Sequence, residues 1–295
     1  PMMIRLLIFL PIGMIAASTA SIFIKLCEAP SLIIATYRMV FASLLLLPFA
    51  SHQKTWRSWN RKEMGWLMLS GFFLSLHFAS WITSLKYTSV ASSVVLVTTH
   101  PIFVGLGAWL FLKEPLGLQL FLGILLSILG SGLISYGDMT LSKEALIGDG
   151  LALIGAMTAS GYFLVGRKMR RNQNLLPYIF PVYSTAGLAL VLFSLLFQKP
   201  FFGYTTTTYL FMFLLALVPQ LIGHTTFNWA LRYLPASMVS ITILGEPIGS
   251  TLLAYFILGE KLTLLKILGG ISIFAGILIA LKKKGGIQDR NDSSL

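Results

Sequence analysis

Long runs of apolar residues, separated by short polar stretches, make up most of this chain. Ten of the runs approach the ~20 residues that a helix needs to cross the hydrocarbon core of a bilayer. They cover roughly residues 4–26, 31–50, 64–84, 89–112, 117–136, 147–166, 177–197, 207–231, 236–258 and 263–281. A membrane β-barrel would instead show weak alternation in segments of about ten residues. The pattern therefore predicts an all-α integral membrane protein with ten transmembrane helices.

The second half of the chain repeats the first at a constant offset of 146 positions, for example from Pro101 to Pro247. At this offset Leu231, Tyr233, Pro247, Ile248, Leu252, Ala254, Leu258 and Glu260 fall on Leu85, Tyr87, Pro101, Ile102, Leu106, Ala108, Leu112 and Glu114. So many identities in one ungapped register indicate a duplication. Because each copy has an odd number of helices, we expect the second copy to enter the membrane from the opposite face. The predicted units are residues 1–139, the inverted repeat 140–284, and a disordered cytoplasmic tail, 285–295.

Composition and charge agree with a membrane protein. The chain is 56% hydrophobic and only 11% charged, whereas soluble domains carry about 25% charged residues. The net charge of +12 comes mainly from loops on one side of the predicted spans, so the positive-inside rule places both termini in the cytoplasm. No basic stripe with interleaved aromatic residues indicates nucleic-acid binding. The expected location is the cell (inner) membrane, with multiple passes.

Two of the predicted spans carry a polar residue directly before a proline. Glu246 precedes Pro247, and the repeat places His100 and Pro101 at the equivalent positions. A carboxylate at bilayer depth costs about 2.5–3.5 kcal/mol, so it usually faces a cavity or a partner. Each proline also frees a carbonyl four residues earlier and kinks the helix, and a freed carbonyl inside a membrane needs a donor or water. We expect Glu246 and His100 to meet near the midplane, as a pair or around a zwitterionic ligand, with Glu246 the best candidate for a proton carrier.

Other polar side chains lie within the apolar spans. Gln220, His224 and Asn228 are four residues apart, so they share one face of an α-helix. His77 and Trp81 have the same spacing in another span. Together they predict a wet interior that binds a substrate, although intramembrane His and Asn also serve as hydrogen-bonding links between helices.

Arg38 is a further charge within an apolar span. Its guanidinium could bind a carboxylate or phosphate of a substrate. It could equally reach back to the membrane interface, because it lies only about two turns into the span. Both alternatives stay open at this point.

Two features at the edges of the spans carry structural predictions. Glu114 stands beside Lys113 at the end of a span, which favours an exposed loop charge. Small residues on the fifth and tenth spans predict close helix packing between halves or protomers; they are Gly123, Ser127, Ser131, Gly269 and Gly276.

Three segments resemble a known family. TSVASSVVLVTTHPIFVGLGAWLFLKEPL, starting at Thr88, and ASMVSITILGEPIGSTLLAYFILGEKL, starting at Ala236, are similar to the paired signature of the drug/metabolite transporter (DMT) superfamily, EamA-like branch. GHTTFNWALRYL, before the second copy, resembles its eighth helix. The resemblance implies an inverted five-helix repeat and a central cavity that binds small metabolites, often amino acids and often for export. The implied cavity positions are His77, Trp81, His100, Tyr162, His224, Asn228 and Glu246.

We therefore expect a secondary transporter, an exporter of small metabolites such as amino acids, that works by alternating access without a cofactor or metal. The alternative is an importer or exchanger of a nucleoside- or nucleotide-like metabolite or drug. An enzyme is not expected, because no HExxH or GxSxG motif occurs, and a channel would need polar rings along the whole pore. Substrate, direction, coupling ion and the choice between monomer and homodimer stay open.

Overall fold

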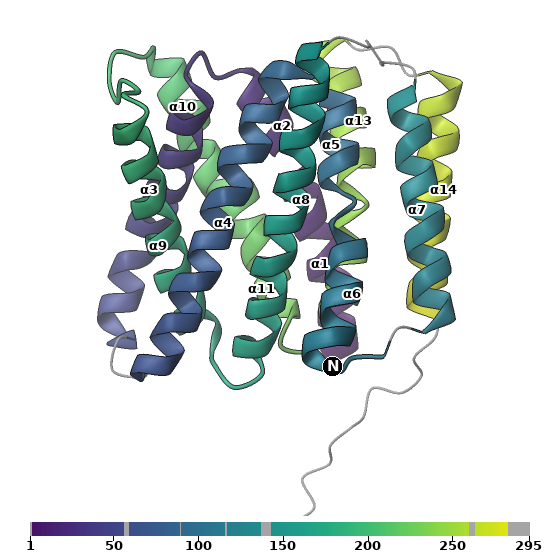
Figure 1. Cartoon of the computed structure of the whole chain (residues 1–295), viewed down its shortest axis with the longest axis horizontal. Helices are drawn as coiled ribbons and strands as arrows, with labels where there is room; N and C mark the ends of the chain where they lie inside the picture. The colour runs from purple at the N-terminus through teal and green to yellow at the C-terminus, as the bar shows by residue number, and fades with distance from the viewer. Residues whose placement is uncertain are drawn as a thin grey trace, which may run out of the picture.

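The computed structural model describes residues 2–55, 59–88, 90–115, 117–136, 143–259 and 263–282. Every regular element in these ranges is a helix, and the helices stand side by side in one bundle (Figure 1). The predicted tail 285–295 and the predicted boundary between residues 139 and 140 lie outside the described residues. An all-helical fold is confirmed for the part of the chain that the structure describes.

The helices follow one another in two comparable series. The first series is α1 Met2–Ser18, α2 Ala20–Lys25, α3 Ser31–His52, α4 Arg61–Tyr87, α5 Val90–Val97, α6 His100–Leu112 and α7 Leu118–Tyr136. The second series is α8 Lys143–Arg170, α9 Leu175–Leu196, α10 Thr206–Leu215, the π-helix η2 Ala216–His224, α11 Thr225–Ala230, α12 Ala236–Ile243, α13 Glu246–Leu258 and α14 Leu264–Lys282.

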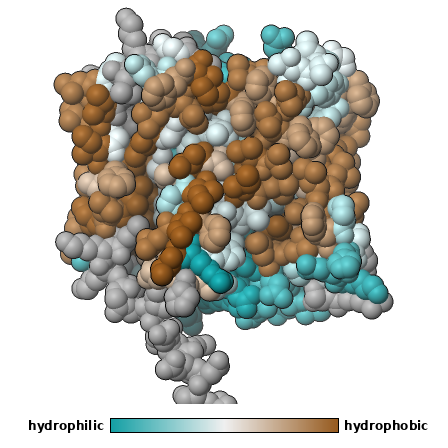
Figure 2. Space-filling model, turned by 180° about the vertical axis from the view of Figure 1, so that it is seen from behind, coloured by the Kyte–Doolittle hydropathy of each residue, from teal (hydrophilic) through white to brown (hydrophobic). Residues whose placement is uncertain are grey.

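Seven helical segments among the described residues are long and apolar enough to cross a membrane. They are Met2–Lys25, Ser31–His52, Arg61–Tyr87, Leu146–Arg170, Leu175–Leu196, Thr206–Ala230 and Ala236–Ile257. The other three predicted spans contain shorter apolar helices, His100–Leu112, Leu118–Gly130 and Ile267–Ile279. On the face seen in Figure 2, apolar side chains form a broad belt, and hydrophilic ones gather towards the lower and upper edges. The protein is therefore a multi-pass membrane protein, and the count of ten spans stays a prediction.

The offset of 146 positions recurs in the helix boundaries. Helices α5, α6 and α7, moved by 146 positions, coincide at both ends with α12, α13 and α14. The residue that follows α6, Lys113, has φ 55°, and its equivalent after α13, Gly259, has φ 68°. This left-handed conformation is readily adopted by glycine and strained for lysine. The same local turn is thus built twice, which agrees with the predicted duplication.

Helices α7 and α14 pack against each other at one edge of the bundle (Figure 1). A Cβ on Gly130 would lie 2.6 Å from the carbonyl oxygen of Gly269, and a Cβ on Gly276 would lie 2.6 Å from that of Gly123. Because these two contacts exchange under the 146-residue offset, the packing is nearly symmetric. The predicted close packing of small residues between the two halves is confirmed.

Helix α4, the longest helix of the first series, begins with a capping box. The Asn60 side chain accepts a hydrogen bond from the backbone N–H of Glu63 at 2.8 Å, and the Glu63 carboxylate accepts one from the N–H of Asn60 at 3.1 Å. Two N–H groups that have no partner within the helix are satisfied in this way. From this fixed start, α4 runs along α8 and carries His77 and Trp81 into the centre of the bundle.

Candidate functional site

A cavity of about 40 Å³ lies at the centre of the bundle, next to the α5–α6 and α12–α13 breaks. About 10–15 Å³ of such space is enough for one water molecule, so the cavity has room for only a few waters. A larger ligand requires the surrounding helices to move apart. The lining residues are Ala17, Ala20, Arg38, His77, Trp81, Val97, Thr98, His100, Ala159, Tyr162, Phe163, His224, Phe227, Ile243 and Glu246.

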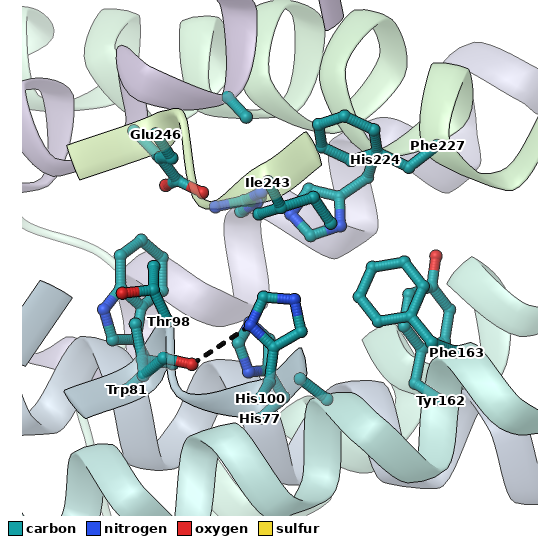
Figure 3. Close-up of a pocket in the computed structure, with 15 residues that line it drawn as sticks. His77, Trp81, Thr98, His100, Tyr162, Phe163, His224, Phe227, Ile243 and Glu246 are labelled. Atoms are coloured by element: carbon teal, nitrogen blue, oxygen red, sulfur yellow. Dashed lines mark hydrogen bonds between the residues drawn. The ribbon is translucent and has the colours of Figure 1, made fainter. Parts of the chain in front are cut away.

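The α5–α6 break brings His100 to the cavity. His100 is the first residue of α6, and Pro101, the second, has no N–H for the carbonyl of Val97. The His100 Nδ1 lies 3.2 Å from that carbonyl oxygen (dashed line in Figure 3). Because a carbonyl only accepts, Nδ1 is the donor, and the proline-freed group is satisfied from within the chain. The other ring nitrogen, Nε2, is buried and has no partner.

The α12–α13 break places Glu246 on the opposite wall. Glu246 is the first residue of α13, and its side chain points into the cavity, across from His77 and His100 (Figure 3). A serine from a neighbouring helix binds the backbone carbonyl of each of the two residues at the breaks. Ser160 Oγ donates to the carbonyl of His100 at 3.1 Å, and Ser18 Oγ donates to that of Glu246 at 3.4 Å. Helices α8 and α1 therefore fix the two residues in corresponding ways.

Arg38 lies in the cavity wall and not at the membrane interface, which decides between its two predicted positions. Its side chain is fully buried, and its Nε donates to Gln220 Oε1 at 2.9 Å. The guanidinium stands 4.0 Å from the centre of the Phe78 ring. Neither Nη1 nor Nη2 has a hydrogen-bond partner. The geometry therefore leaves a guanidinium edge free to bind an acceptor in the cavity.

His77 and His224 complete the polar part of the wall. His77 Nδ1 donates to the carbonyl of Gly155 at 2.9 Å, which links α4 to α8. Its ring stacks on Trp81 at 5.9 Å between centres, with only 12° between the planes. His224 meets the Phe78 ring edge-on at 5.4 Å, and its Nδ1 has no partner. Both imidazoles are thus held by contacts with the protein while they face the cavity.

Two predicted site residues, Gln220 and Asn228, do not line the cavity. Gln220 holds Arg38, and Asn228 Nδ2 donates to the hydroxyl of Tyr162, a lining residue, and to the carbonyl of His224 at 2.9 Å. The prediction of one polar face assumed an α-helix. Gln220 in fact lies in a π-helix from Ala216 to His224, whereas Asn228 lies in the α-helix α11. Both residues support lining residues from behind.

Aromatic rings that the sequence did not single out close the cavity. Phe163 stacks on His100 at 5.7 Å with 22° between the planes, and Phe227 lies beside His224. Figure 3 shows Phe163 and Tyr162 together at one end. In an apolar span such residues carry no local signal, because they resemble lipid-facing or packing residues. Only the fold identifies Phe163 as a lining residue.

Glu114 is buried rather than exposed, contrary to the expectation from its neighbour Lys113. Its exposed fraction is 9%. Its Oε1 lies 2.8 Å from Arg167 Nε and 2.9 Å from Arg171 Nη2, and its Oε2 accepts a hydrogen bond from the N–H of Ala236 at 3.3 Å. The left-handed turn at Lys113 directs the chain, and with it Glu114, towards these partners. The sequence missed the ion pairs because both partners are more than fifty residues away.

The central arrangement can bind a ligand that has both an acceptor and a donor. Arg38 offers free N–H groups, whereas Glu246 and the unpartnered His100 Nε2 offer acceptors. Among the described residues, no group of three or more His, Cys, Asp or Glu side chains is placed to hold a metal ion. The lining residues thus offer charge, hydrogen bonds and aromatic contact to a ligand.

A family model for the EamA-like transporter family matches the chain twice, over residues 4–136 and 146–282. A protein of Archaeoglobus fulgidus, named as an uncharacterized transporter, is 25% identical over 90% of this chain and 92% of its own length. YdfC of Bacillus subtilis, named likewise, is 25% identical over 85% of this chain and 81% of its own. A riboflavin transporter of Vibrio cholerae is 24% identical over 36% of each chain.

The fold also has a counterpart among solved structures. One crystal structure superposes with a TM-score of 0.77 at 15% sequence identity, covering 94% of this chain and 96% of that chain. This likeness concerns the fold alone.

Proposed function

Because this chain belongs to the EamA-like transporter family of the DMT superfamily, we propose that it is a secondary transporter that moves a small metabolite across the cytoplasmic membrane by alternating access. Ten helices would form two inverted five-helix repeats, with the site between them. The contact between Glu114, just after α6, and Ala236, at the start of α12, supports inversion. The end of α6 lies beside the start of α12, and the span α5–α6 corresponds to the span α12–α13 in the repeat. This position is expected if the two corresponding spans run in opposite directions.

The observation that carries the proposal is the shared cavity. His100 and Glu246 come from equivalent helix breaks in the two halves, and both line it together with Arg38. Polar residues inside a membrane are costly and mark substrate or ion pathways. A rocking movement of one half against the other would open this cavity to one side at a time. Its small volume fits a closed intermediate in such a cycle.

The polar groups favour a substrate with an anionic end and a cationic or hydrogen-donating end. Arg38 would bind a carboxylate, and Glu246 would face an ammonium group. Trp81, Phe163 and Phe227 would contact an apolar body. An amino acid has this combination of groups, so we propose amino-acid export as the leading activity, with Glu246 as the proton-carrying group.

A second candidate is import or exchange of a flat aromatic metabolite of the nucleoside or drug type. The aromatic walls would stack on such a ring system, and the partial match to a riboflavin transporter points the same way. The choice between a monomer and a homodimer stays open for both candidates. The basic end of α8 would face the cytoplasm, in line with the positive-inside rule.

The test is uptake into proteoliposomes that contain the purified protein, with a panel of amino acids, nucleosides, riboflavin and cationic drugs at two pH values. Saturable counterflow of one panel member, increased by a proton gradient, is the expected result. Ion conductance in planar bilayers without saturable counterflow would indicate a channel and would contradict the proposal. Selective counterflow of riboflavin or nucleosides would favour the second candidate over amino-acid export.

A further inference from the structure

A second, larger cavity lies at the end of the bundle where α6 and α8 end and α7 and α12 begin. Its volume is about 660 Å³, within the 300–1,000 Å³ range of typical ligand sites. It is separate from the central cavity, because the two share no lining residue. Lys113, Arg167 and Arg171 contribute positive charge, and Glu114 is the one acidic residue among its described lining residues.

The ion pairs with Glu114 do not neutralise all of the positive charge in this cavity. Glu114 accepts from one nitrogen of Arg167 and one of Arg171, so the three basic side chains and one carboxylate leave two net positive charges. The Arg171 side chain is 45% exposed, and Lys113 is exposed as well. Arg167 also donates to the carbonyl of Leu231 at 2.7 Å, which fixes its position. The cluster therefore carries net positive charge at its exposed side, where Lys113 lies and where Arg171 binds Glu114 through one nitrogen only.

Most of the remaining cavity wall is apolar, with Gln119 and Ser237 as its uncharged polar residues, which distinguishes this site from one for a small soluble anion. Its apolar lining consists of Leu112, Pro115, Leu118, Leu120, Pro235 and Met238. Leu118 is 72% exposed, and Phe111 and Phe121, on the adjoining helices, are 78% and 56% exposed. The apolar wall thus continues outward onto exposed apolar side chains of α6 and α7 that would contact acyl chains. A ligand that matches both parts has an anionic head group and hydrocarbon chains.

We propose that this cavity binds the head group of an anionic phospholipid, with its phosphate at Lys113 and Arg171 and its chains along α6 and α7. Basic pockets between transmembrane helices at the cytoplasmic surface are suited to such head groups. A bound lipid would bridge α6, α8 and α12, the elements that Glu114 already joins. The site would then stabilise one arrangement of the two halves. The proposal stands apart from the identity of the transported substrate.

Native mass spectrometry of the full chain, released from detergent with equal amounts of phosphatidylglycerol and phosphatidylcholine, tests the proposal. The wild type should retain phosphatidylglycerol preferentially. The double variant Lys113→Gln/Arg171→Gln should retain it about 30-fold less, because it lacks two charges at the head group. The charge-conserving pair Lys113→Arg/Arg171→Lys should retain it nearly as well as the wild type, which controls for folding.

A matched control variant removes two positive charges that lie near the cavity but do not line it. Lys168 stands 3.7 Å from the Trp66 ring, and Arg232 donates to Asn174; neither lines the cavity. The variant Lys168→Gln/Arg232→Gln should keep the lipid. Equal loss in this control, or no lipid preference in the wild type, would overturn the proposal. Displacement of the lipid by inorganic phosphate alone would assign the cavity to a soluble anion and overturn it too.

Discussion

His100 and Glu246 lie 146 positions apart in the sequence, each is the first residue of a helix, and both side chains line one central cavity. The same structural element therefore supplies an imidazole from one half and a carboxylate from the other. Figure 3 shows them on opposite walls. A repeated break in the helices thus creates a polar site that is symmetric in position and asymmetric in chemistry.

Replacing His100 with Ala should destabilise the protein. The variant leaves the proline-freed carbonyl of Val97 without its donor at membrane depth, and it removes the ring that stacks on Phe163. An unsatisfied buried carbonyl costs about 1–3 kcal/mol. Thermal unfolding in detergent should show a lower midpoint than for the wild type. The matched control, His52→Ala at the exposed end of α3, should leave the midpoint unchanged, and an equal effect would refute the role of this bond.

Arg38→Lys should weaken substrate binding by about tenfold or more, because an ammonium group cannot replace two parallel N–H donors. Arg38 keeps its position through Gln220, so Gln220→Leu should weaken binding as well, through a guanidinium that is no longer oriented. Equilibrium binding to the purified protein measures both. Arg61→Lys, at the exposed start of α4, is the control. Unchanged affinity in Arg38→Lys would mean that the guanidinium does not bind the ligand.

Gly276→Ala should force α7 and α14 apart. The added Cβ would lie 2.2 Å from Ser127 Oγ and 2.6 Å from the Gly123 carbonyl oxygen, and backbone cannot move aside as a flexible side chain can. A lower unfolding temperature is expected. Gly132→Ala, on α7 with open space around the new Cβ, should leave it unchanged or raise it slightly. Equal behaviour of the two variants would contradict this account of the packing.

Arg167 and Arg171 should differ in their contributions to stability, although both pair with Glu114. Arg167 is 13% exposed and also donates to a backbone carbonyl, whereas the Arg171 side chain is 45% exposed. Exposed pairs contribute about 0–1 kcal/mol, whereas leaving a buried polar partner unsatisfied costs about 1–3 kcal/mol. Arg167→Gln should therefore lower the thermal midpoint more than Arg171→Gln. The reverse order would be inconsistent with the burial described.

The sequence predicted the repeat and the two residues at its helix breaks, because identities at a fixed offset and prolines inside apolar spans are local signals. Arg38 could not be placed from sequence, since its position depends on Gln220, 182 residues away. The inward position of Glu114 depends in the same way on distant arginines. Gln220 and Asn228 lie behind the lining, because Gln220 binds Arg38 and Asn228 binds Tyr162 and His224, which are contacts that no sequence pattern reveals.

The most direct test of the proposed transport mechanism is flux through Glu246→Gln in proteoliposomes, measured at two pH values beside the wild type. The amide keeps the size of the side chain but cannot carry a charge or exchange a proton. Flux should fall about tenfold or more, since a hydrogen bond to a charged group contributes about 1.5–3 kcal/mol, and the response to a proton gradient should disappear. Glu144→Gln, at the exposed start of α8, should behave as wild type. Unchanged flux with an unchanged pH dependence in Glu246→Gln would contradict the account.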